Sequence, residues 1–433
     1  MRISFLFPAL FILNTVAAQL PQVPFDLPGY TFIQYNANQL ELVHNNSGYI
    51  NLFAKFDTLM RTGQNQIRIV HLGGSHIQAD IYTHRIRQEL QSLYPGMLGA
   101  RGFIFPFKIA RTNSPSNLKI SYTGEWLTSK NTQPDTIYPL GVSGITSALI
   151  SKTGSLNVIA SFDTVRRYDF NRIRIFCNSA DLQHIPVLYP ENLVKAVTID
   201  YKAKCVQYEL NSYSDSLNVY IYQHDTLQPF ELYGISLDND DPGVIYNSIG
   251  VNGAMLKSYL RCGLFSSQME ALNPDWVIIS IGTNEGNTRK FDEAAYRREY
   301  LSLLDTIRKA APGTAILLTV PNDSYLQKKY INHNTSRIRE IIFDIAEDNN
   351  CGVWDFYTIM GGLNSAKAWF NNGLMSKDHI HFNKQGYLLK GNLFYAAFLR
   401  SWNDPSFTHL TEFPSPTPLG SDIETPLSAS PIP

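Results

Sequence analysis

The sequence is poor in charge of either sign. Only 17% of its 433 residues are charged, and 36 Lys and Arg against 37 Asp and Glu give a formal net charge of -1. Binding to nucleic acid or to an acidic membrane surface depends on excess positive charge, so we expect neither partner. Hydrophobic residues make up 44% of the chain, which is enough for a globular protein with a substantial core.

Cysteine is also scarce. The four cysteines, Cys177, Cys205, Cys262 and Cys351, show no CxxC or Cys/His spacing, so we expect no metal site. An even count in an exported chain permits one or two disulfides, and buried thiols are the other interpretation. The sequence leaves this open.

Long apolar runs are missing after the first residues. The opening stretch MRISFLFPALFILNTVAA joins Arg2 to a short apolar run that ends in Ala17 and Ala18. This pattern predicts a signal peptide over residues 1–18, because the run is too short to span a bilayer. We expect an exported protein, periplasmic or extracellular, with no membrane span.

Two kinds of pattern divide the remaining chain. Strands and helices alternate before and after a central region in which short, alternating strands follow one another. The first pattern predicts an α/β domain with a parallel sheet, and the second predicts an antiparallel β-sandwich of jelly-roll type. The predicted segments are 19–111 and 241–403 for the two parts of the α/β domain, 112–240 for the inserted β-rich domain, and 404–433 for a disordered tail rich in Pro, Ser and Thr.

The stretch HLGGSHIQAD places Ser75 directly after a buried strand and two glycines. A helix is predicted from Ala79 onward, so Ser75 lies on the turn between a strand and a helix. In an open α/β sheet ligands bind at the carboxyl ends of the strands, where a nucleophile would be useful. Gly73 and Gly74 permit a sharp turn. The alternative is that Ser75 only caps the helix.

The stretch KDHIHFNKQGY could supply a base for that serine. Asp378 and His381 are three residues apart on a loop that precedes the last helix, and a serine nucleophile needs a base that a third group orients. His379 is a competing base. Alternatively, Asp378 or Asn383 caps the helix.

Two further turns carry potential hydrogen-bond donors. Asn284 follows the apolar strand DWVIISIG, and Gly253 lies in SIGVNGA, which also ends a strand. The Asn284 amide and the Gly253 N–H could stabilise an oxyanion at the same sheet edge. Asn and Gly are also ordinary turn residues.

Together these four stretches resemble the sequence blocks of the SGNH (GDSL-type) hydrolases. The resemblance implies a flavodoxin-like α/β/α sandwich and no cofactor. It implies that Ser75 is the nucleophile, His381 the general base and Asp378 its orienting partner, with an oxyanion hole formed by Ser75, Gly253 and Asn284. Gly250 fits the second block less well than Gly253. The usual GDS of the first block is GGS here, with Gly74 in place of Asp.

A closer resemblance is to bacterial peptidoglycan O-acetylesterases, which carry a carbohydrate-binding-like β domain between the first two blocks. It implies removal of acetyl groups from a glycan, most simply peptidoglycan. Alternatives are an esterase or lysophospholipase, a xylan-type acetylesterase, an acetyltransferase, or a glycan-binding protein with weak catalysis.

Other polar and aromatic residues have plainer interpretations. His71 is expected to be a core histidine with its hydrogen bonds satisfied, and His76 to shape the pocket. Gln78 and Asp80 are expected to support the start of the helix. In the insert, Tyr122, Glu125 and Trp126 could contact a sugar, but aromatic residues of a β-sandwich usually lie in its core.

Overall fold

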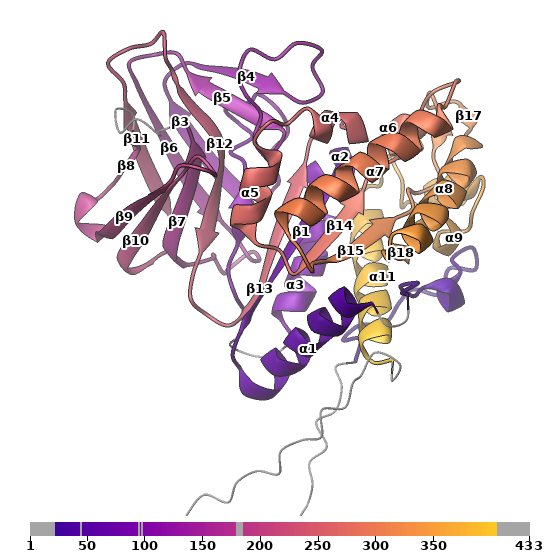
Figure 1. Cartoon of the computed structure of the whole chain (residues 1–433). Helices are drawn as coiled ribbons and strands as arrows, with labels where there is room; N and C mark the ends of the chain where they lie inside the picture. Colours follow the sequence, from indigo (N-terminus) through magenta and orange to yellow (C-terminus); the bar gives the residue numbers. More distant parts are fainter. Residues whose placement is uncertain (1–21, 44–45, 94–95, 97, 179–184, 405–433) are drawn as a thin grey trace, which may run out of the picture.

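The structure is a computed structural model that describes residues 22–43, 46–93, 96, 98–178 and 185–404. The predicted signal peptide lies outside the described residues, as does the predicted tail except for its first residue. The N-terminal and C-terminal parts of the chain come together around one sheet, and the β-rich region lies beside it (Figure 1).

The parallel sheet has five strands. They are β1 (Gln66–Gly73), β13 (Gly243–Gly250), β14 (Trp276–Ser280), β15 (Ala315–Thr319) and β18 (Gly352–Trp354), and the order across the sheet is β13-β1-β14-β15-β18. Numbered along the chain, this order is 2-1-3-4-5, the flavodoxin-like arrangement. The strands are short apolar runs, as expected for a parallel sheet that is covered on both faces. The predicted α/β fold is confirmed.

Helices cover the two faces of this sheet, and alternate residues of a strand serve the two cores. Trp276 and Ile278 of β14 belong to one core, whereas Val277 and Ile279 belong to the other. The first core is covered by α1 (Ser47–Thr62), α3 (Tyr82–Gln91) and α11 (Lys384–Trp402), and the second by α4 (Leu256–Leu260), α5 (Phe265–Leu272), α7 (Glu293–Ala310) and α8 (Asn334–Asp348) (Figure 1).

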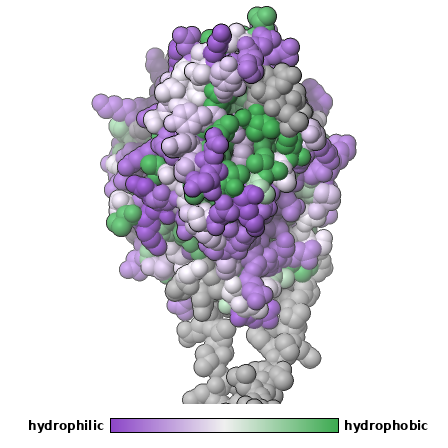
Figure 2. Space-filling view, turned by 90° about the vertical axis from the view of Figure 1, so that its left-hand side faces the viewer, coloured by the Kyte–Doolittle hydropathy of each residue, from purple (hydrophilic) through white to green (hydrophobic). Residues whose placement is uncertain are grey.

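The β-rich region consists of two antiparallel sheets. The larger contains β2 (Gly102–Ile104), β4 (Trp126–Lys130), β5 (Ile145–Leu149), β7 (Phe170–Cys177), β9 (Val194–Asp200), β10 (Cys205–Ser214) and β12 (Phe230–Asp238). The smaller contains β3 (Leu118–Thr123), β6 (Thr153–Ala160), β8 (Val187–Leu188) and β11 (Leu217–Tyr222). Buried side chains of both sheets share one core. Viewed from the side of this region, the surface is largely hydrophilic, with one larger hydrophobic area and a few smaller hydrophobic spots (Figure 2).

Two local features refine the sequence-based expectations. The helix predicted from Ala79 begins only at Tyr82, because Asp80 adopts a left-handed conformation with φ of 46°. A short helix, α2 (Ser75–Gln78), therefore precedes α3. All four cysteines are buried thiols.

Candidate active site

The turn after β1 brings Ser75 to the carboxyl edge of the sheet, where α2 begins. Gly73 allows this turn because a Cβ atom there would lie 2.2 Å from the Ile77 Cγ1 atom and 2.9 Å from the Ser280 carbonyl oxygen. The buried Tyr259 hydroxyl donates a hydrogen bond of 2.7 Å to the Gly73 carbonyl. The turn that holds Ser75 is thus fixed by close packing and by a hydrogen bond.

Ser75, His381 and Asp378 form a chain of hydrogen bonds. The Ser75 Oγ atom lies 2.8 Å from His381 Nε2, and His381 Nδ1 lies 2.7 Å from Asp378 Oδ2. The other Asp378 oxygen accepts backbone N–H bonds from Ile380 and His381, each 3.0 Å long. Burial favours the neutral acid, but the bonds from His381 and Ile380 outweigh it and lower the pKa of Asp378. An anionic carboxylate therefore holds the imidazole with Nε2 toward the serine.

The two histidines of this loop have different surroundings. The His379 ring stacks on Tyr325 at 4.4 Å between ring centroids, and it is His381 that contacts Ser75. Asn383 caps α11, because its side chain accepts the Gly386 N–H at 3.1 Å. Asp378 is thus not needed as the cap.

Asn284 and Gly253 lie on turns next to Ser75. Asn284 sits in the first turn of α6 (Thr283–Gly286), and its amide donates a hydrogen bond of 2.9 Å to the Ala254 carbonyl. Gly253 has φ of 80°, a conformation that favours glycine. Among the described residues, no hydrogen bond occupies the backbone N–H of Ser75 or of Gly253. Both groups are therefore available as donors.

The two other glycines singled out by sequence have packing roles. A Cβ atom at Gly250 would lie 2.4 Å from the Gln78 backbone nitrogen, so Gly250 lets α2 approach β13 closely. A Cβ atom at Gly74 would lie 3.2 Å from the Asn284 Nδ2 atom. A side chain at the position that departs from the family pattern would thus press on the Asn284 amide.

Gln78 and Asp80 do more than support a helix start. The Gln78 Oε1 atom accepts the Asn252 N–H at 2.8 Å, and its amide donates to the Asn113 side chain at 2.9 Å. Gln78 therefore ties the serine-bearing helix to the turn that holds Gly253.

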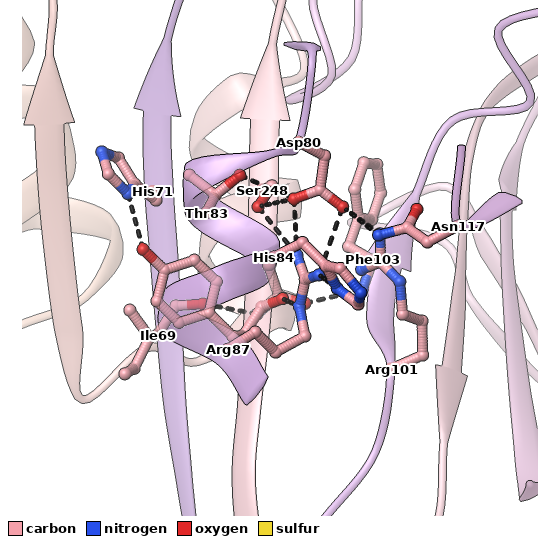
Figure 3. Close-up of polar contacts among 12 residues, drawn as sticks. Ile69, His71, Asp80, Thr83, His84, Arg87, Arg101, Phe103, Asn117 and Ser248 are labelled. Atoms are coloured by element: carbon pink, nitrogen blue, oxygen red, sulfur yellow. Dashed lines mark hydrogen bonds and ion pairs between the residues drawn. The ribbon is translucent and has the colours of Figure 1, made fainter. Parts of the chain in front are cut away.

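Asp80 is the centre of a buried polar network that joins α2 and α3 to β13 and to the insert (Figure 3). Its carboxylate pairs with Arg87 at 2.9 Å and Arg101 at 3.1 Å, and it accepts bonds from Asn117 at 2.9 Å and Ser248 at 2.8 Å. Burial favours the neutral acid, but the two guanidinium groups outweigh it and hold the pKa of Asp80 far below its usual range. Sequence reasoning missed this network, because its members are distant in the chain.

Sequence reasoning also missed a buried lysine near the site. Lys390 lies on the inward face of α11, with its Nζ atom 4.4 Å from the Phe356 ring centroid and 4.8 Å from that of Tyr82. Burial lowers the pKa of Lys390 to about 7. The available signal was its helical spacing from Tyr387 and Phe394, which marks an apolar face.

His76 joins this group to the serine. Its Nδ1 atom lies 2.9 Å from the Tyr387 hydroxyl, and its ring centroid is 5.0 Å from that of His381. Burial first, and then the charge of Lys390, lower the pKa of His76 well below its ordinary value. A neutral His76 thus packs beside His381, although whether it shapes a substrate pocket stays a prediction.

The plainer expectations for His71 and Trp126 are confirmed. His71 is fully buried, and its two ring nitrogens lie 2.6 Å from the Tyr246 and Ser280 hydroxyl oxygens. Trp126 lies in the insert core and donates to the Thr123 carbonyl at 3.0 Å. Tyr122 is 39% exposed, and Glu125 is exposed too.

The described residues contain no cluster of three or more His, Cys, Asp or Glu side chains that could hold a metal ion. Within the same ranges, every helix is too short or too polar to cross a membrane.

The chain is similar to several known proteins. Residues 225–389 match the GDSL-like lipase/acylhydrolase family. A solved peptidoglycan O-acetylesterase structure is similar over 84% of this chain and 99% of its own, with 20% identity and a TM-score of 0.66. A lipase/acylhydrolase from Enterococcus faecalis (17% identity, 37% of this chain and 77% of that one, TM-score 0.29) and an acetyl xylan esterase (21% identity, 36% and 82%, TM-score 0.29) are also similar in part. No curated protein sequence matches the chain.

These findings confirm the predicted resemblance and support a serine hydrolase: the chain has the fold of a peptidoglycan O-acetylesterase, and its residues 225–389 have the sequence pattern of GDSL-like lipases and acylhydrolases.

Proposed function

We propose that this protein is a serine esterase that removes O-acetyl groups from a glycan, most simply peptidoglycan, with Ser75, His381 and Asp378 as its catalytic triad. The observation that carries the proposal is the chain of short hydrogen bonds from Ser75 through His381 to Asp378 at the carboxyl edge of the sheet. This is the arrangement that activates a serine hydroxyl, because the base is oriented and its cation is stabilised.

The first half of the reaction forms an acetyl-enzyme. The Ser75 oxygen attacks the acetyl carbonyl while its proton moves to His381 Nε2, and the carbonyl oxygen becomes an oxyanion. The N–H groups of Ser75 and Gly253 and the Asn284 amide donate to this oxyanion. An amide nitrogen has two hydrogens, so Asn284 can keep its bond to the Ala254 carbonyl while the second hydrogen serves the substrate.

The second half releases acetate. The bond between the carbonyl carbon and the sugar oxygen breaks, and His381 gives its proton to that oxygen. Water then attacks the acetyl-enzyme, again losing a proton to His381, and Ser75 leaves with that proton as acetate departs. No step requires a cofactor.

Export belongs to the same proposal, because a glycan of the cell wall lies outside the cytoplasm. The sequence of residues 1–18 supports it, with an early Arg2 and a short apolar run.

The test is acetate release from O-acetylated peptidoglycan, O-acetylated xylan and a small aryl acetate, with the mature protein and Ser75→Ala side by side. We expect release from a glycan that the variant loses. If O-acetylated xylan is turned over faster, xylan and not peptidoglycan is the preferred substrate. If only the aryl acetate is turned over, the result favours a small-ester or lipid esterase. Equal background from both proteins would refute the catalytic role of Ser75.

A further inference from the structure

The charge of the molecule is balanced as a whole but not around Ser75. Three segments next to the site, residues 287–291, 325–331 and 376–381, contain five exposed cations and a single carboxylate, Asp378, which is bonded to His381. The five cations are Arg289, Lys290, Lys328, Lys329 and Lys377, and we call them the cationic rim. A protein with a formal net charge of -1 thus collects positive charge at one edge.

Hydrogen bonds connect these three segments to one another and to the site. Residues 325–331 form a hairpin of β16 (Tyr325–Leu326) and β17 (Tyr330–Ile331). The Gln327 N–H donates to the Asn287 side chain at 2.8 Å, and the Tyr325 N–H donates to the His379 carbonyl at 3.0 Å. The hairpin therefore bridges the segment after Asn284 and the loop that holds Asp378 and His381.

The tip of this hairpin contains two residues in a left-handed backbone conformation, and one of them is a lysine of the rim. Gln327 and Lys328 have φ of 53° and 63°, which is uncommon for residues other than glycine. Strained backbone of this kind is concentrated at binding and catalytic sites. Lys329 also lies over the exposed Tyr330 ring, 5.4 Å from its centroid.

Among the described residues, no carboxylate forms an ion pair with any of the five rim cations, although the carboxylates Asp292 and Glu299 line the pocket between Asn284 and the 287–291 segment. At the start of α7, Asp292 accepts the Ala295 N–H and Glu293 pairs with Arg337. Asp135 is also exposed, but it lies outside the three segments of the rim. Backbone carbonyl groups next to it accept hydrogen bonds from Arg261.

We infer that the cationic rim binds carboxylate groups of the substrate, so that the enzyme acts on an anionic glycan in preference to a neutral one. The inference rests on the proposed function and specifies its substrate class. Unpaired cations beside a reactive group raise the local concentration of anions and speed their association. A carboxylate-bearing polymer such as peptidoglycan fits this rim, whereas a neutral acetylated xylan has no group that would pair with it.

The experiment compares one polymer in two charge states. O-acetylated peptidoglycan is used intact and after its carboxyl groups have been amidated, with an aryl acetate as a small substrate. The variants are Arg289→Gln/Lys290→Gln and Lys328→Gln/Lys329→Gln, separately and combined. Lys119→Gln/Lys195→Gln removes two exposed cations elsewhere, on β3 and β9, and is the matched control.

We expect kcat/KM on the intact polymer, relative to the aryl acetate, to fall about tenfold or more in the combined variant, as electrostatic steering allows. Amidation of the polymer should cause a similar fall for the wild type, and added salt should weaken its preference for the intact form. The control variant should keep the wild-type ratio. Equal turnover of intact and amidated polymer, or a combined variant with the wild-type ratio, would overturn the inference.

A binding measurement separates this inference from the proposed function. Ser75→Ala is sedimented with intact peptidoglycan, with amidated peptidoglycan and with vesicles that contain phosphatidylglycerol. Selective binding to the intact polymer that the rim variants lose would support the rim even if no esterase activity is found. Binding to both polymers alike, or to the vesicles only, would refute it, whatever the result of the acetate assay.

Discussion

The buried Lys390 allows a quantitative prediction. Its side chain is enclosed by aromatic rings, including Tyr82, Phe356 and Phe382, and only 6% of the residue is exposed. Burial lowers its pKa from 10.5 to about 7, so the charged form is costly inside the fold. We expect that replacing it with a neutral side chain of similar length, in Lys390→Met, increases the free energy of unfolding.

The magnitude and the pH window follow from the two pKa values. Between pH 7 and 10 the unfolded chain binds more protons at Lys390 than the folded chain does, so the free energy of unfolding rises with pH. The cost of burying the lysine is about 4 kcal/mol at pH 7, about 2 kcal/mol at pH 9 and less than about 1 kcal/mol at pH 10. Attraction between the ammonium group and the rings can offset roughly 1–2 kcal/mol of this.

Urea unfolding of the wild type and Lys390→Met between pH 6 and 10 measures the difference directly. We expect the variant to be more stable by about 2–4 kcal/mol at pH 7, and the difference to shrink by about 2 kcal/mol by pH 9. Lys384→Met is the matched control, because Lys384 begins the same helix but is exposed. A difference that does not change with pH, or grows with it, would show that the lysine stays charged among the rings and would refute the reasoning.

Three substitutions test the site and its support. Asp378→Asn should lower kcat by about 10³–10⁴-fold, because the amide no longer stabilises the correct His381 tautomer. The kinetics of aryl acetate hydrolysis measure this effect, and a near-normal kcat would exclude Asp378 from the triad. Asn284→Ala should lower kcat by about 10²–10³-fold with little change in KM, whereas a change confined to KM would assign Asn284 to substrate binding. Asp80→Ala should lower the free energy of unfolding by about 3–5 kcal/mol, because it leaves Arg87 and Arg101 buried without a counter-charge. A urea midpoint like that of the wild type would show that the arginines find water or other partners.

Elements with strong periodicity were predictable from sequence. The apolar run before Ser75 is β1, and the apolar stretch DWVIISIG contains β14. The hydrophobic pattern of such an element involves only residues that are close together in the sequence, so the sequence alone predicts it. The interruption at Asp80 was not predictable in this way. Its left-handed backbone turns the carboxylate toward Arg87 and Arg101, and only the folded chain supplies both partners.

The proposed catalytic residues were found for a similar reason. Ser75 and Asn284 follow strands whose ends a parallel sheet brings to one edge. Asp378 and His381 precede the last helix, and it was the resemblance to the SGNH hydrolases that assigned all four their roles. The choice between His379 and His381 was harder, because both are close to Asp378. The structure separates them through packing, since the His379 ring stacks on Tyr325, and no local pattern encodes that contact.

The composition of the chain does not show how its charges are distributed over the surface. A formal net charge of -1 describes a sum over the chain, and it gave no reason to expect an anionic partner. Electrostatic attraction depends instead on which charges lie together within about one Debye length, roughly 8–10 Å. Lys328 and Lys377 are distant in sequence, yet their segments are joined by the bond between Tyr325 and His379. The same sum can therefore arise from an even surface or from a cationic edge beside a nucleophile, and the binding properties of the two differ.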